Sequence, residues 1–102
     1  MYASKYFDLG KVLVTNRIYD TMTKNKRFTL DVGVSLQRYC VRDWGNLSEE
    51  DKKTNNAALL DPDDLYLLAA YQTCESKIYI ITNRVSEVTG ENVTTVCFPD
   101  ER

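Results

Sequence analysis

The first apolar and polar positions of the chain predict a strand followed by a short helix. A run rich in β-branched residues favours a strand over Lys11 to Thr15. Asn16 follows it and can cap a helix over residues 17–25, where apolar residues lie four positions apart. The basic tetrapeptide at 24–27 is expected to end that helix, because cations stabilise the negative end of the helix dipole.

A second helical pattern occupies residues 28–44. Its apolar residues recur three or four positions apart, as on one buried helix face, and they are Val32, Leu36, Tyr39, Cys40 and Trp44. Gly33 weakens this prediction, since glycine costs a helix about 1 kcal/mol relative to alanine. Gly45 is expected to end the helix in a left-handed conformation.

A third helix is predicted from Ser48 onwards. The Ser48 hydroxyl can cap it, and the three acidic residues that follow complement the positive end of the helix dipole. Few apolar residues lie in this helix, so most of it should be exposed, and the "DPDD" segment at 61–64 should end it. We therefore expect a structural junction between the two helices, formed by Asp43, Trp44, Gly45 and Ser48.

Three runs rich in β-branched and aromatic residues, at 65–73, 77–83 and 92–98, predict a sheet. Their short connections favour an antiparallel meander. In the middle run Ile78 and Ile80 should face one side and Tyr79 and Ile81 the other, which predicts a central strand partly covered on its second face. The expected fold is a single α+β domain over residues 1–102: one N-terminal strand, two to three helices and a three-stranded antiparallel meander packed against them.

Composition limits the chemistry that the chain can perform. Its 102 residues contain no histidine, and the three cysteines lie far apart without a CxxC pair, so we expect neither a metal nor another cofactor. Cys40 and Cys97 fit a core, whereas Cys74 fits an exposed turn. No apolar run approaches the length of about 20 residues that a bilayer requires, and no signal peptide is evident, which favours a cytoplasmic protein without membrane contact.

Charge is unevenly distributed along the chain. Residues 1–42 hold eight lysines and arginines against three acidic residues, whereas residues 43–102 hold five against twelve. Such asymmetry can steer a partner or support a homo-oligomer, although both signs can also intermix after folding.

Carboxylates are the only plentiful catalytic groups. A pair drawn from Asp43, Glu49, Glu50 and Asp51 could in principle perform acid–base chemistry on a glycoside. The helix dipole explains these acids without catalysis, so we expect no enzyme, and a carboxylate-dependent hydrolase is only a third alternative.

Two binding surfaces are conceivable from the residues. An acidic surface could occupy a basic groove on another protein, and its candidate contacts are Glu49, Glu50, Asp51, Asp63 and Asp64. A nucleic-acid surface would instead use the basic first half with Tyr6 and Tyr19, although a pI of about 5.1 argues against it. Its candidate cations are Lys5, Lys11, Arg17, Lys24, Lys26, Arg27, Arg38 and Arg42.

The segment "RDWGNLSEEDKKTNNAAL" resembles a family of small bacterial proteins usually labelled plasmid-related, which share a GDWGDL..EDK..N..AL block. The resemblance extends to "LGKVLVT" at 9–15, "LAAY" at 68–71, "IIT" at 80–82 and "TTVCFP" at 94–99. The chain departs from the family at Arg42, where the family has glycine, and in the longer "RVSEVTGEN" connection before the last strand.

This resemblance implies residence on plasmids, phages or other mobile genetic elements, and it carries over no catalytic residue. The leading hypothesis is a non-enzymatic protein that binds another protein, such as an inhibitor of host defence of the anti-CRISPR or anti-restriction type. A small nucleic-acid-binding or regulatory module is the alternative.

Overall fold

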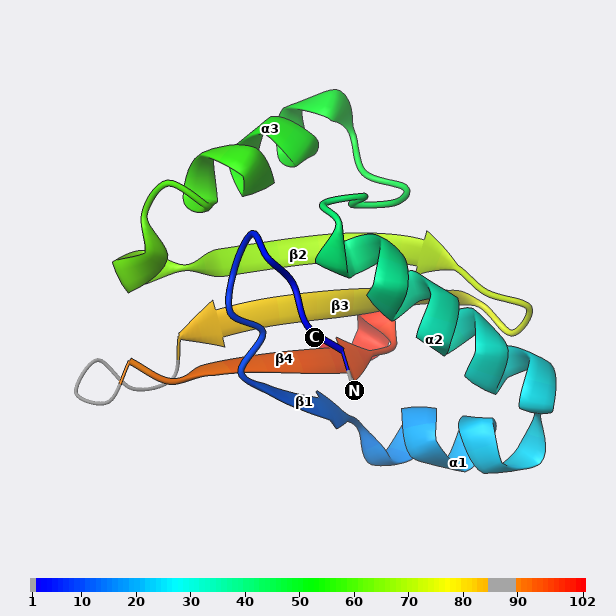
Figure 1. Cartoon of the computed structure of the whole chain (residues 1–102). Helices are drawn as coiled ribbons and strands as arrows, with labels where there is room; N and C mark the ends of the chain where they lie inside the picture. Colours follow the sequence, from blue (N-terminus) through cyan, green and yellow to red (C-terminus); the bar gives the residue numbers. More distant parts are fainter. Residues whose placement is uncertain (1, 85–89) are drawn as a thin grey trace.

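The computed structural model describes residues 2–84 and 90–102, which form an α+β fold with a four-stranded sheet (Figure 1). The α+β class predicted from sequence is confirmed. In chain order, the elements are β1 (Lys11–Val14), α1 (Asn16–Lys24), α2 (Lys26–Cys40), α3 (Glu49–Ala58), η1 (Pro62–Asp64), β2 (Tyr66–Gln72), β3 (Lys77–Arg84), β4 (Asn92–Cys97) and η2 (Pro99–Glu101), where η denotes a 3₁₀ turn.

The sheet is mixed, with the strand order β1-β4-β3-β2. The β2–β3 and β3–β4 pairs are antiparallel, but β1 pairs in parallel with β4, so the expectation of a purely antiparallel meander was wrong. Side chains of β4 hold the residues before β1: Thr94 Oγ1 donates to the Leu9 carbonyl at 2.7 Å, and Asn92 Nδ2 donates to the Asp8 carbonyl at 2.8 Å. These contacts join residues more than eighty positions apart, which local periodicity cannot reveal.

The first two helices begin one and two residues earlier than the sequence predicts. Thr15, rather than Asn16, caps α1, because its Oγ1 accepts from the Ile18 amide at 3.2 Å. Asn25 caps α2 through its side-chain oxygen, which accepts from two amides of the first turn. The basic tetrapeptide at 24–27 therefore spans two helices, with Lys24 in the last turn of α1 and the final two cations opening α2.

The end of α2 also differs from the prediction. The helix ends at Cys40, and Arg42, with φ 65°, is the left-handed residue that follows it. Gly45 also has a positive φ of 75°, as predicted, but it lies beyond the end of the helix. Trp44 lies beyond the helix, yet it is buried in the core as predicted. Gly33 is accommodated inside α2, where the Tyr2 hydroxyl approaches it closely.

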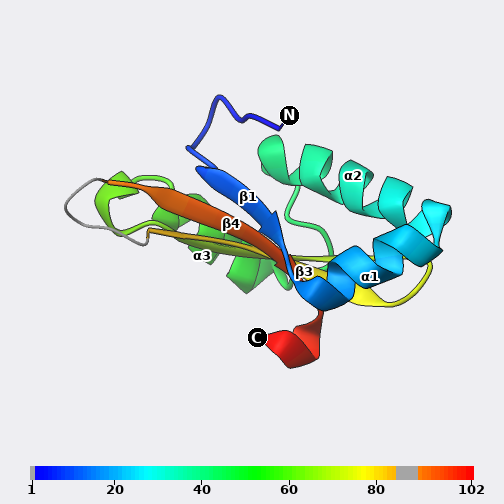
Figure 2. The same ribbon diagram turned by 90° about the horizontal axis from the view of Figure 1, so that it is seen from below.

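The core lies between α2 and one face of the sheet (Figure 2). Fully buried side chains of α2 meet those of β2, β3 and β4, and they include Phe28, Tyr39, Leu67, Ile78, Ile80 and Val96. Tyr39 Oη donates to Thr82 Oγ1 at 2.7 Å, which in turn lies 2.7 Å from Thr94 Oγ1. Desolvation raises the pKa of Tyr39, so this hydroxyl stays a neutral donor inside the core.

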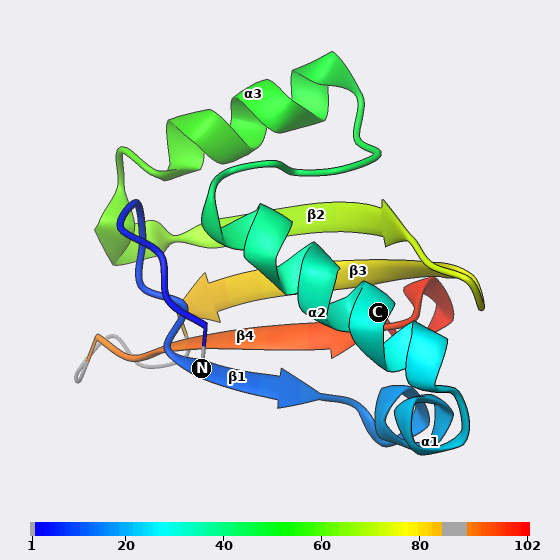
Figure 3. The same ribbon diagram turned by 45° about the vertical axis from the view of Figure 1, so that its right-hand side comes forward.

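The third helix agrees with its prediction. Ser48 Oγ accepts from the Asp51 amide at 3.1 Å and caps α3. Most of α3 is exposed, and it lies alongside β2 rather than over the core (Figures 1 and 3). β3 is central, as predicted, with Ile78 and Ile80 buried and Tyr79 and Ile81 half-buried on the opposite face. In the longer connection between β3 and β4, residues 85–89 lie outside the described residues.

Candidate partner-binding site

The predicted junction starts with an ion pair. Arg38 Nε and Nη2 donate to the two Asp43 carboxylate oxygens at 2.7 and 3.1 Å, and the same carboxylate accepts from the Gly45 amide. These hydrogen bonds, chiefly the one from Arg38, hold the pKa of Asp43 below its usual value. A general acid needs a raised pKa, so Asp43 is suited to fixing the loop rather than to proton donation.

Residues 44–46 then extend along the outer edge of β2. Ala70 N–H donates to the Trp44 carbonyl at 3.3 Å, and Asn46 N–H donates to the Ala70 carbonyl at 2.7 Å. Gly45 forms the bridge with Ala70 at φ 75°, and a Cβ there would lie 2.0 Å from the Ala70 oxygen. Glycine is therefore required both for its positive φ and for this close approach.

Asn55 of α3 completes the closure of this edge. Its side-chain amide donates to the Leu68 carbonyl at 2.8 Å and accepts from the Leu68 amide at 3.3 Å, as a neighbouring strand would. Sequence reasoning missed this role. Asn55 lies on the same helical stripe as Ala58 and Leu59, so a polar residue on the inward side of α3 was the available signal. The outer edge of β2 is thus occupied by the protein's own chain, which explains the junction structurally.

The five acidic residues proposed as a contact surface form two groups. Glu49, Glu50 and Asp51 occupy the first turn of α3, and Asp63 and Asp64 follow its other end. A ten-residue helix is about 15 Å long, so the two groups do not converge. All five are exposed, and Asp63 Oδ1 lies 3.4 Å from Arg84 Nη1.

Asp51 alone among them lines a groove that reaches the sheet. The groove holds about 230 Å³, and its lining residues are Asp51, Thr54, Asn55, Tyr66, Leu68 and Arg102. Arg102 Nη2 donates to the Tyr66 hydroxyl at 3.3 Å across it. The structure therefore connects the acidic start of α3 with the face of the sheet opposite the core.

That face, here called the open face, is largely apolar. The strand register places Leu13, Thr95, Ile81 and Leu68 in one row across all four strands, and a second row contains Lys11, Val93, Asn83 and Tyr66. Leu13 and Tyr66 are 44% and 47% exposed, Lys11 is also exposed, and the remaining members of these rows are half-buried. The C-terminal turn η2 covers only part of the open face (Figure 2).

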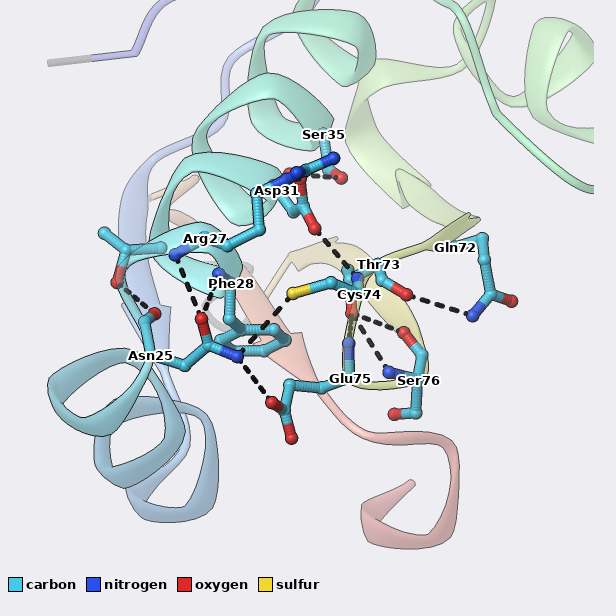
Figure 4. A network of polar contacts seen from close by, with 11 residues as sticks. Asn25, Arg27, Phe28, Asp31, Ser35, Gln72, Thr73, Cys74, Glu75 and Ser76 are labelled. Atoms are coloured by element: carbon cyan, nitrogen blue, oxygen red, sulfur yellow. Dashed lines mark hydrogen bonds and ion pairs between the residues drawn. The ribbon is translucent and has the colours of Figure 1, made fainter.

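A second cluster of polar groups surrounds the β2–β3 turn, and its role is structural (Figure 4). The Asp31 carboxylate accepts from the Cys74 amide at 2.8 Å, and Asn25 Nδ2 donates to Glu75. Desolvation and the Asp31 carboxylate raise the pKa of the exposed Cys74 thiol, which keeps it protonated and weakly nucleophilic. Cys40 and Cys97 are buried, as predicted.

The residues that the structure describes include no group of three or more His, Cys, Asp or Glu side chains arranged to hold a metal ion. Over the same residues, no helix is long and apolar enough to cross a bilayer. Together these features define a small α+β protein with a mixed sheet, one face of which is covered by a long helix while the other is mostly open. The chain matches no protein-family model, no curated protein and no solved structure.

Proposed function

We propose that this chain is a non-enzymatic protein of a mobile genetic element that acts by binding another protein, and that its target is a host defence effector. The observation that carries the proposal is the open face of the sheet. Solvent-facing sheet positions are commonly polar, but here they include Leu13, Tyr66, Ile81 and Val93. Contiguous exposed apolar surface is typical of sites where proteins bind other proteins.

The charge beside the open face indicates the chemistry of the partner. Asp51 borders the groove, and Glu49 and Glu50 lie one turn or less away on α3. Apolar contact flanked by carboxylates fits a partner whose surface combines apolar side chains with lysines or arginines. Proteins that cleave or survey nucleic acids present such basic surfaces, because they must neutralise phosphates.

The mobile-element part of the proposal rests on the resemblance of the "DWGNLSEEDK" block to plasmid-related proteins. That the target is a CRISPR or restriction effector is inferred from the mobile-element setting that this resemblance implies. Asp43, Trp44 and Gly45 fix the loop between α2 and α3 against the edge of β2. The exposed carboxylates that follow them on α3 have no part in this loop and are available for a partner.

The nucleic-acid alternative is weakened by ion pairs that neutralise part of the basic half. Arg17 pairs with Asp100 at 2.8 Å, and Arg38 pairs with Asp43 at 2.7 Å, so carboxylates of the second half intermix with cations of the first. A duplex DNA gel shift at low salt tests this alternative. A band shift that disappears steeply as salt rises would favour it over protein binding.

Affinity capture with purified defence effectors tests the proposal. The immobilised protein should retain a CRISPR or restriction effector, and Tyr66→Glu or Asp51→Lys should reduce retention by about tenfold or more. Leu60→Glu is the matched control for Tyr66→Glu, since Leu60 is 86% exposed and lies off the open face. Asp20→Lys is the matched charge control, because Asp20 is exposed on α1 and belongs to neither acidic group. Equal loss with the controls, or retention of no effector, would contradict the proposal.

A further inference from the structure

The outer side of α2 forms a second surface, on the opposite side of the molecule from the open face. α2 crosses the sheet diagonally, and no other helix or strand of the described residues covers its outer side (Figure 3). The surface, here called the α2 outer surface, is formed by Lys26, Arg27, Leu30, Val34, Val41 and Arg42.

Three aliphatic residues form the middle of the α2 outer surface. Leu30, Val34 and Val41 are 66%, 54% and 64% exposed, although the buried face of α2 already supplies the core. Leu30 and Val34 lie one turn apart on α2, about 40° from each other around the helix axis, and Val41 is the residue that caps the end of the helix. An isolated exposed leucine needs no explanation, but several branched residues exposed along one helix and its cap are typical of a helix-binding stripe.

Cations outnumber carboxylates around this stripe: Asp31 is half-buried beside Arg27, and Asp43, which follows Arg42, is paired with Arg38. The exposed residues from 26 to 42 are Lys26, Arg27, Thr29, Leu30, Val34, Gln37, Val41 and Arg42. Arg27 Nε lies 3.4 Å from Asp31, but the arginine side chain remains 74% exposed. The surface is therefore both apolar and basic.

Arg42 is held at this surface in an unfavourable backbone conformation. Its φ of 65° lies in the left-handed region, which costs a non-glycine residue about 1–2 kcal/mol. Its guanidinium lies 3.8 Å from the ring centroid of Tyr6, which holds the charge against the N-terminal segment. This conformation closes the C-terminal end of α2, because the Arg42 and Asp43 amides donate to the Tyr39 and Arg38 carbonyls at 3.2 and 2.9 Å.

The cations disfavour a second copy of the chain as the occupant. Antiparallel pairing of two α2 helices through the stripe would bring Lys26 of one copy towards Arg42 of the other, and parallel pairing would oppose identical cations. Like charges in contact are unfavourable. Nucleic acid also fits poorly, because branched aliphatic side chains would occupy the centre of a phosphate-binding surface.

We propose that the α2 outer surface binds an acidic amphipathic helix of another protein. The apolar side of that helix would pack on Leu30, Val34 and Val41, and its carboxylates would face Lys26, Arg27 and Arg42. This proposal is independent of the one for the open face, since the two surfaces lie on opposite sides of the sheet. A chain with both would link an acidic helix to a partner bound at the open face.

Fluorescence anisotropy with designed peptides tests this proposal on the full chain. The probe is a helical peptide of about 20 residues with leucines at i, i+4, i+7 and i+11 and glutamates on their flanks. The control peptide replaces each glutamate by lysine. The acidic peptide should bind at least about tenfold more tightly than the basic one, and Val34→Glu should weaken it by about tenfold or more. Leu60→Glu, at an even more exposed aliphatic residue elsewhere, should not change binding.

Three results obtained without lipid would overturn the proposal. They are equal or absent binding of the two peptides, equal effects of Val34→Glu and Leu60→Glu, and a dimer in light scattering that Val34→Glu dissociates. Binding of the chain to vesicles of phosphatidylcholine with phosphatidylglycerol is measured as a final comparison. Stronger binding to these vesicles than to the acidic peptide would assign the surface to lipid instead. Circular dichroism of each variant checks that it remains folded.

Discussion

Replacing Asn55 by alanine should destabilise the fold by about 2 kcal/mol, although the residue lies on an otherwise exposed helix. The side chain makes both hydrogen bonds available at the outer edge of Leu68. Without it, one amide and one carbonyl lose their partners, and each loss costs about 1–3 kcal/mol when water cannot reach the group. Leu68 is half-buried, so partial access of water places each cost near the lower limit.

Urea unfolding followed by fluorescence of Trp44, the single tryptophan, measures this effect. A loss of about 2 kcal/mol should lower the urea midpoint by about 1–2 M. Asn46→Ala is the matched control: Asn46 contributes its main-chain amide to the same strand edge, and this amide is retained. The control should change stability by less than about 0.5 kcal/mol. Equal effects of the two substitutions would refute the idea that the Asn55 side chain closes the edge.

Three further predictions concern the junction. Gly45→Ala should cost about 3 kcal/mol or more in thermal or urea unfolding, because its Cβ would lie 2.0 Å from the Ala70 oxygen at a positive φ. Arg42→Gly should be more stable than Arg42→Ala by about 1 kcal/mol, since both lose the side chain but only glycine tolerates the left-handed conformation; equal midpoints would contradict this. Asp43→Asn should destabilise the fold near pH 7 and lose this effect in acid. Hydrogen bonds from Arg38 lower the folded pKa of Asp43 below 3.8, so the stability that they contribute is fully present above that value and is lost as pH falls through the folded pKa. A difference in unfolding free energy between the wild type and Asp43→Asn that stayed constant across this pH range would contradict this prediction.

Local sequence patterns predicted the helices and strands because capping and the burial of one face depend on residues that lie close together in the sequence. The stripe from Val32 to Cys40 marked the buried side of α2, and Ser48 with its acidic neighbours marked the start of α3. The cap of α1 was misplaced by one residue because Thr15 and Asn16 offer adjacent polar side chains with similar capping ability. The choice between them depends on packing that the pattern does not contain.

Long-range pairing was the part that sequence could not supply. The parallel contact of β1 with β4 depends on hydrogen bonds from Asn92 and Thr94 to residues near the N-terminus. The open face was visible only as the apolar outward positions Tyr79 and Ile81, and its continuity with Leu13 required the register of all four strands. The acidic residues that were grouped as one surface from the sequence lie at the two ends of α3.

The most direct test of the proposed function is a plating assay in a bacterial host with active CRISPR or restriction immunity. Expression of the wild-type chain should raise the plating efficiency of a targeted phage, and Leu60→Glu should do so equally. Tyr66→Glu, which places a charge on the open face, should abolish the rise while the variant remains folded. Unchanged plating with the wild-type chain, or full activity of Tyr66→Glu, would contradict the account.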